Sequence, residues 1–212
     1  MSEARRTAGR PKRGTEVLNR TRIGEATVAA LRAHGANGLT VSRIAAELDV
    51  RSQTLYHHMS TIGDAVNAAR GSLLSAVDPA VFERLPWEEA TVEFATTYYR
   101  AFNPLGQANS VFFLHKITDP LTLQIYEAFL HGAQAAGVSG ERAMQLLLDI
   151  EQVIFSLIFE HMSWHALFDP AAIELAGAHT LGRLLRDRDA SEGQPVERLR
   201  DTVRSLSDAA RR

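Results

Sequence analysis

The stretch LTVSRIAAELDVRSQTLYHHM, residues 39–59, decides the fold. Thr40 is a suitable N-cap for a short helix, and the run Asp49-Val50-Arg51 ends that helix after two turns. A second short helix is expected over residues 52–59. Two short amphipathic helices joined by a tight turn predict a helix-turn-helix. The side chains expected to form its small core are Val41, Ile44, Ala45, Leu48, Val50, Leu55 and Met59.

One face of the second helix carries side chains that form hydrogen bonds. With Leu55 and Met59 turned inward, the residues left outside are of the types that reach base edges and phosphates in a major groove. The amino end of the helix also favours a phosphate. A competing interpretation is a packed Tyr56 beside a solvated His57-His58 pair. The candidate contact residues are Arg51, Ser52, Gln53, Thr54, Tyr56, His57 and His58.

The charges are divided unevenly along the chain. Residues 1–70 hold 11 Lys and Arg against 6 Asp and Glu, whereas residues 71–212 hold 12 against 19. A basic segment before an acidic remainder is typical of a polyanion-binding module joined to a different domain, although a basic tail without a partner has the same balance. Residues 1–14, rich in Arg, Lys, Gly and Pro, predict a disordered basic arm.

The quoted stretch resembles the DNA-binding signature of the TetR family of transcriptional regulators. The likeness spans residues 15–75 and is most specific at Leu55-Tyr56-His57-His58, and Gly9-Arg10-Pro11-Lys12 resembles the arm that often precedes this domain. Asp49 stands where Gly is usual, and Asp tolerates left-handed backbone better than most residues. Met59 replaces a Phe, and Ile62-Gly63 replaces a charged pair, so one phosphate contact is expected to be missing.

The resemblance implies a role for each candidate. Ser52, Gln53 and Thr54 would face base edges, and Tyr56 and His58 would contact the DNA backbone. Thr40 would donate to a phosphate. Counterion-releasing contacts would come from the arm residues Arg10, Lys12 and Arg13.

The whole chain is predicted to be all-α. Proline and capping residues divide it into further helices. A three-helix helix-turn-helix DNA-binding domain over residues 15–77 would be followed by a larger helical effector-binding and dimerisation domain over residues 78–190. A polar tail or short helix would occupy residues 191–212. The helices expected after Thr61, which can cap the first of them with Asp64, lie near residues 62–77, 87–102, 105–116, 120–136, 140–167 and 170–188.

The resemblance implies an effector pocket between the central helices and a dimer built on the helices 140–167 and 170–188. Most aromatic side chains here would serve as core in any helical domain, so the pocket residues are candidates only. Those candidates are Phe102, Phe112, Tyr126, Phe129, Gln152, Phe155 and Phe159. The candidate dimer contacts are Ile154, Leu157, Ile158, His161, His165, Leu181 and Leu184.

The helix 140–167 is apolar around most of its circumference. Its polar stripe of Asp149, Gln152, Ser156, Glu160 and Ser163 is either a narrow solvent edge or the wall of a pocket or subunit seam. His161 and His165 lie four residues apart on one face, but without a third ligand we expect hydrogen bonding and no metal.

The sequence therefore favours a ligand-responsive repressor that binds a palindromic double-stranded operator as a homodimer and is released by a small, largely apolar effector. With no Cys, no long apolar run and no secretory pattern, we expect a cytoplasmic protein that contacts no membrane and needs no cofactor. The sequence contains no grouping of a nucleophile with a base that would indicate an enzyme. A DNA-bound scaffold whose second domain only dimerises is the remaining alternative.

Overall fold

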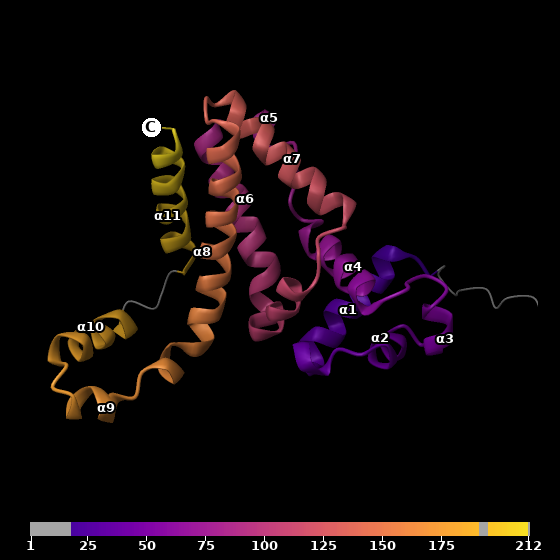
Figure 1. Cartoon of the computed structure of the whole chain (residues 1–212), viewed down its shortest axis with the longest axis horizontal. Helices are drawn as coiled ribbons and strands as arrows, with labels where there is room; N and C mark the ends of the chain where they lie inside the picture. The colour runs from indigo at the N-terminus through magenta and orange to yellow at the C-terminus, as the bar shows by residue number, and fades with distance from the viewer. Residues whose placement is uncertain (1–17, 191–194, 212) are drawn as a thin grey trace, which may run out of the picture.

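The structure, a computed structural model, describes residues 18–190 and 195–211, except for the side chains of residues 160–167 and 188–190. Every regular element in the described ranges is a helix, which confirms the predicted all-α class. Figure 1 shows the amino-terminal helices gathered at one end and the longer helices beside them. None of the described helices is both long and apolar enough to cross a membrane.

The amino-terminal helices are α1 (Arg20–His34), α2 (Val41–Glu47), α3 (Ser52–Leu55) and α4 (Ile62–Leu74), with a 3-10 turn η1 (Ala36–Gly38) after α1. The capping pattern expected from the sequence is present. The Thr40 side chain accepts from the Arg43 N–H, and Thr61 and Asp64 form a reciprocal capping box at the start of α4. The second helix of the motif is shorter than predicted, because residues 56–58 form a turn.

The first four helices enclose a small core of their own. Five of the seven predicted core side chains are buried there, and Val41 and Val50 are half-buried against it. The helices α1 and α4 cross closely because Gly24 has no side chain: a Cβ at this position would lie 2.3 Å from the carbonyl oxygen of Ala68. The buried five are Ile44, Ala45, Leu48, Leu55 and Met59.

The second part of the chain is built around α6 (Trp87–Phe102), α7 (Pro120–Ala135) and α8 (Gly140–Leu167), which match three predicted helices closely. A one-turn helix α5 (Val81–Arg84) precedes α6. The predicted α-helix at 105–116 is wrong: residues Asn103–Leu114 form the 3-10 segment η2, broken at Gly106, where φ is 50°. The Asn109 side chain donates to the carbonyls of Phe102 and Gly106 and so stabilises this irregular path.

The carboxyl-terminal third also differs from the sequence-based expectation. The single helix expected at 170–188 is two helices, α9 (Pro170–Leu175) and α10 (His179–Ala190), separated where Gly177 takes a φ of 63°. These two helices pack on each other, and in Figure 1 they stand off from the rest. Where a polar tail or a short helix was expected, the chain forms a 16-residue helix, α11 (Pro195–Ala210), which packs against α6 and α8 and buries Leu199 and Val203.

Helix α4 belongs to both hydrophobic cores. Ala65 and Ala68 lie in the small amino-terminal core, whereas Val66, Ala69 and Leu74 lie in the large core of the second part. Helix α4 is therefore the packing link between the helix-turn-helix core and the large core.

Candidate functional site

The surface around α3 presents unengaged polar side chains above a buried apolar base. Leu55 and Met59 are buried as predicted, and Tyr56 is 57% exposed. The exposed tyrosine excludes the interpretation of a packed aromatic. Within the described chain, none of the seven candidate side chains in this surface has a hydrogen bond or ion pair. Apart from half-buried Ser52, all are exposed: Arg51, Gln53, Thr54, Tyr56, His57 and His58.

The turn between α2 and α3 positions this surface. Asp49 has a φ of 53°, the left-handed geometry expected where Asp replaces Gly. Thr40 is exposed at the start of α2, where its oxygen accepts from a backbone N–H and its hydroxyl proton stays available for a phosphate. The predicted arm contacts Arg10, Lys12 and Arg13 lie outside the described residues.

Most of the predicted effector contacts gather in the large core. Phe102 lies with its ring centroid 5.2 Å from that of Phe112 and 5.6 Å from that of Phe155. Phe129 belongs to a second aromatic group with Phe82 and Trp87. Tyr126 and Phe159 pack against the same core from its edge. The structure thus brings the aromatic candidates into one continuous core.

Gln152 does not join them. Its side chain is exposed and lines a surface groove of about 470 Å³ between α8 and α11, together with Asp149 and Ser156 on α8 and Arg198 on α11. Gln152 was expected among the aromatic contacts, but the turn of α8 that carries it faces away from them. The described part of the polar stripe is therefore the wall of this groove.

A buried hydrogen-bond cluster that the sequence did not reveal lies beside the aromatic core. The Tyr98 hydroxyl donates to Glu151 Oε1 at 2.8 Å, and the Tyr126 hydroxyl donates to the same oxygen. Burial raises the pKa of both tyrosines, and the nearby Glu151 carboxylate raises the pKa further. Both hydroxyls therefore stay protonated and act as donors across the physiological range.

The predicted dimer contacts fall into three groups. Ile154, Leu157 and Ile158 are buried in the chain's own core, which corrects the expectation that they contact a second copy. Leu181 and Leu184 on α10 are 39% and 53% exposed. The side chains of His161 and His165 lie outside the described residues. Among the described residues, no three His, Cys, Asp or Glu side chains are grouped so as to hold a metal ion.

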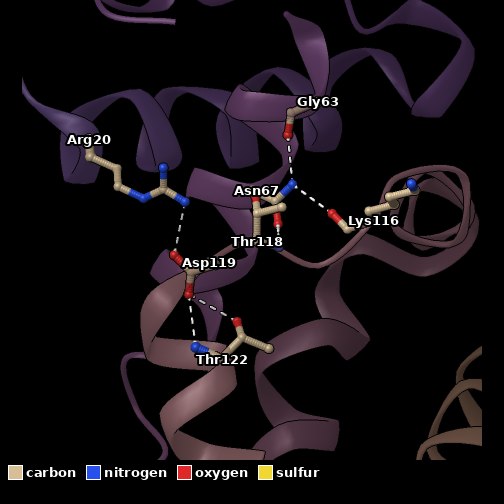
Figure 2. Close-up of polar contacts among 7 residues, drawn as sticks. All are labelled: Arg20, Gly63, Asn67, Lys116, Thr118, Asp119 and Thr122. Atoms are coloured by element: carbon tan, nitrogen blue, oxygen red, sulfur yellow. Dashed lines mark hydrogen bonds and ion pairs between the residues drawn. The ribbon is translucent and has the colours of Figure 1, made fainter.

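One buried asparagine of α4 forms hydrogen bonds to the segment between η2 and α7. Asn67 Nδ2 donates to the carbonyls of Gly63 and Lys116 at 3.0 Å each, and its Oδ1 accepts from the Thr118 N–H at 2.8 Å. Figure 2 shows these bonds linking α4 to the residues that lead into α7. Asn67 is 4% exposed, so its bonds are shielded from water.

A second contact ties the start of α7 to both α1 and α4. Asp119 is 3% exposed; one carboxylate oxygen accepts from Arg20 at 3.1 Å and the other from the backbone and hydroxyl of Thr122 at 2.9 Å each (Figure 2). Gly71 of α4 lies against this carboxylate, because a Cβ there would be 2.5 Å from Asp119 Oδ1. We call Arg20, Asn67, Gly71 and Asp119 the α4 joint.

Comparison with known proteins agrees with this architecture. No family model matches the chain, and no curated protein matches it by sequence. A possible TetR-family regulator from Streptomyces coelicolor A3(2) has a TM-score of 0.72 at 21% identity, covering 91% of this chain and 98% of its own.

Two further solved structures are similar over nearly their whole length. A TetR variant from Acinetobacter baumannii AYE in complex with minocycline has a TM-score of 0.64 at 17% identity, covering 91% of this chain and 96% of its own. Mycobacterium smegmatis BioQ has a TM-score of 0.63 at 22% identity, covering 92% of this chain and 98% of its own. The chain therefore has the fold of the TetR-family transcriptional regulators.

Proposed function

We propose that this protein is a ligand-responsive transcriptional repressor that binds a palindromic operator as a homodimer. The observation that carries the proposal is the surface around α3, where exposed polar side chains without internal partners cover a compact helix-turn-helix core. Polar groups in this state are free to exchange water for base edges and phosphates. The fold and the net positive charge of residues 1–70 support the same function.

Individual contacts follow from position. Gln53 and Thr54 extend from the first turn of α3 and suit base edges, since an amide side chain can bond to two atoms of an adenine. Arg51 and Tyr56 flank them at either end of α3 and suit phosphates. Thr40 would add a contact from the start of α2, and Arg10, Lys12 and Arg13 would add contacts from the arm.

The dimer gives the operator its symmetry. Two recognition surfaces related by a two-fold axis require half-sites separated by about 34–36 Å, or about one turn of B-DNA. An effector bound in the larger core would favour a spacing of the two surfaces that no longer fits. A solved structure with the same fold contains minocycline, which supports a small-molecule effector here.

The experiment begins with in vitro selection of duplexes from a random-sequence library, followed by fluorescence anisotropy with the selected duplex. We expect an inverted repeat and tight binding that weakens as salt rises. Tyr56→Ala should abolish this binding without changing the oligomeric state. The matched control is Leu123→Ala, which removes a similarly exposed apolar side chain from α7. No enrichment of any duplex, or full binding by Tyr56→Ala, would overturn the recognition surface.

Two further variants separate base contacts from phosphate contacts. Gln53→Ala should cost about 1–3 kcal/mol on the selected operator and relax preference at a single base pair. Arg51→Ala should weaken binding to all duplexes and lower the salt slope by about one. Equal losses on every sequence for both variants would contradict this assignment.

A further inference from the structure

Helix α4 carries a buried cation, Arg70, that has no counterion within the part of the chain that the structure describes. Arg70 is 4% exposed, and its Nη2 donates to the Phe112 carbonyl at 2.7 Å. Its Nε is buried and has no acceptor, and among the described residues Arg70 forms no ion pair. A guanidinium is always charged, and a buried charge is strongly disfavoured unless an anion and further hydrogen bonds accompany it. The Nε–H of Arg70 is therefore a buried charged donor that lacks an acceptor in the described chain.

The surroundings of Arg70 are aromatic. Its guanidinium carbon lies 5.1 Å from the centroid of the Phe112 ring, which packs on Phe102, and Phe102 packs on Phe155. The nearby Glu151 is occupied differently, because its Oε1 accepts from two tyrosine hydroxyls. A cation beside aromatic rings suits a ligand that has one carboxylate attached to a hydrophobic group. A phosphate is less suitable, because one guanidinium leaves its second negative charge unpaired against the aromatic rings.

The Phe112 carbonyl that now accepts from Arg70 belongs to the least regular element of the large core. Segment η2 is 3-10 rather than α-helical and is broken at Gly106, and the hydrogen-bond geometry of a 3-10 helix is poorer than that of an α-helix. Directly after η2, Lys116 and Thr118 bond to Asn67, which lies one helical turn before Arg70 on α4. Arg70 and Asn67 thus hold η2 and the following segment against the same helix.

We propose that the effector is a hydrophobic carboxylic acid whose carboxylate binds Arg70 in place of the Phe112 carbonyl. This inference rests on the proposed ligand-responsive function and names the ligand's chemical class. A carboxylate accepts from both Nε and Nη2, whereas the carbonyl engages only Nη2. The acid's body takes space beside Phe102 and Phe155, so η2 moves away from α4. That displacement pulls on the Asn67 bonds and changes the position of α4 under the helix-turn-helix.

The test measures thermal unfolding and calorimetric binding of the full chain with benzoate, 2-naphthoate and decanoate, each paired with its amide. We expect at least one acid to raise Tm and its amide to have no effect. Arg70→Met should abolish that rise, while Arg100→Met, which removes an exposed arginine from α6, should keep it. If Arg70→Met does not fold, the proton and nitrogen resonances of Arg70 Nε in the wild-type chain should still shift on addition of the acid and stay unchanged with the amide.

Several results would overturn the inference: no rise in Tm with any of the three acids, equal rises with the amides, or a rise that survives in Arg70→Met. The acid should also weaken anisotropy-detected binding to the selected operator at least tenfold in the wild-type chain only. Binding of the acid with unchanged operator affinity would overturn the displacement of η2. A chain that binds the acid through Arg70 but binds no duplex would support this ligand class and overturn the proposed repressor.

Discussion

At the scale of single residues, Asp64 illustrates how a side chain fixes the start of α4. Its Oδ2 accepts from the backbone N–H groups of Ser60 and Thr61 at 2.8 and 2.9 Å. The bond from Thr61 is the main cause that holds the pKa of Asp64 below its usual value, and the bond from Ser60 adds to it. Because these bonds need the carboxylate, their contribution to stability is present above the unfolded-state pKa of about 3.9 and is lost as the pH falls through the folded-state value.

We therefore predict that Asp64→Ala lowers the free energy of unfolding by about 1 kcal/mol at pH 7. The difference in the free energy of unfolding between the variant and the wild type should narrow as the pH is lowered below about 4, because the wild type then loses the bonds to the Asp64 carboxylate as well. Urea unfolding followed by circular dichroism measures both quantities. Asp201→Ala, which removes a highly exposed carboxylate from α11, should change stability little at either pH. A stability difference between Asp64→Ala and the wild type that widens in acid would contradict the bonding of Asp64.

Local residue patterns predicted local contacts well. Thr40, Thr61 and Asp49 behave as the sequence indicated, because a cap or a left-handed turn depends on residues three or four positions away. Arg20 and Asp119 lie 99 positions apart, and the sequence offers no signal that joins them. Asp119 accepts from the Thr122 N–H as the N-cap of α7, which is a local contact, whereas its bond to Arg20 of α1 depends on the tertiary packing.

At the scale of elements, the α4 joint depends on the absence of a side chain at Gly71. Asp119 cannot move aside, because Thr122 and Arg20 hold both of its oxygens. We predict that Gly71→Ala destabilises the fold by about 1–3 kcal/mol through this overlap. Chemical unfolding measures the effect, and Gly140→Ala is the control, since a Cβ there meets only the Gln134 side chain at 3.4 Å.

Combining Gly71→Ala with Arg20→Ala tests whether the two residues act on the same contact. Both changes act on the Asp119 carboxylate, so the double variant should lose less stability than the two single variants together. Strict additivity would show that Gly71 and Arg20 act on separate contacts. Operator binding by Gly71→Ala, measured with the selected duplex, shows in the same samples whether the joint sets the position of the helix-turn-helix.

Helices with a strong apolar period were predicted more accurately than irregular ones. The bounds of α6, α7 and α8 were predicted closely, because each helix has a clear start signal and an apolar face. The prediction failed at η2, where Gly106 and the Asn109 side-chain bonds replace an α-helical path. At α11 it left a polar tail and a short helix as alternatives, and the structure has a helix. Leu199, Val203 and Ser207 are buried in that helix, and their burial depends on α6 and α8 being in place.

At the scale of the whole molecule, α9 and α10 present an apolar surface that the described chain leaves uncovered. Leu175 is 92% exposed and Leu184 53%, and the two helices pack mainly on each other. Exposed apolar side chains of this size in adjacent helices commonly mark a subunit interface. The expectation that Leu181 and Leu184 contact a second copy is therefore retained as a prediction, whereas Ile154, Leu157 and Ile158 of α8, buried in the chain's own core, are withdrawn as contacts.

We predict that the double variant Leu181→Asp, Leu184→Asp is monomeric in sedimentation equilibrium at concentrations where the wild type is a dimer. Two buried carboxylates at a subunit interface cost far more than they gain there. Because these helices lie apart from both cores, the variant should keep the wild-type circular dichroism spectrum. It should also lose tight binding to an inverted repeat, since one recognition surface alone contacts one half-site. Leu123→Asp on α7 is the control and should stay dimeric; a dimeric double variant would place the interface elsewhere on the molecule.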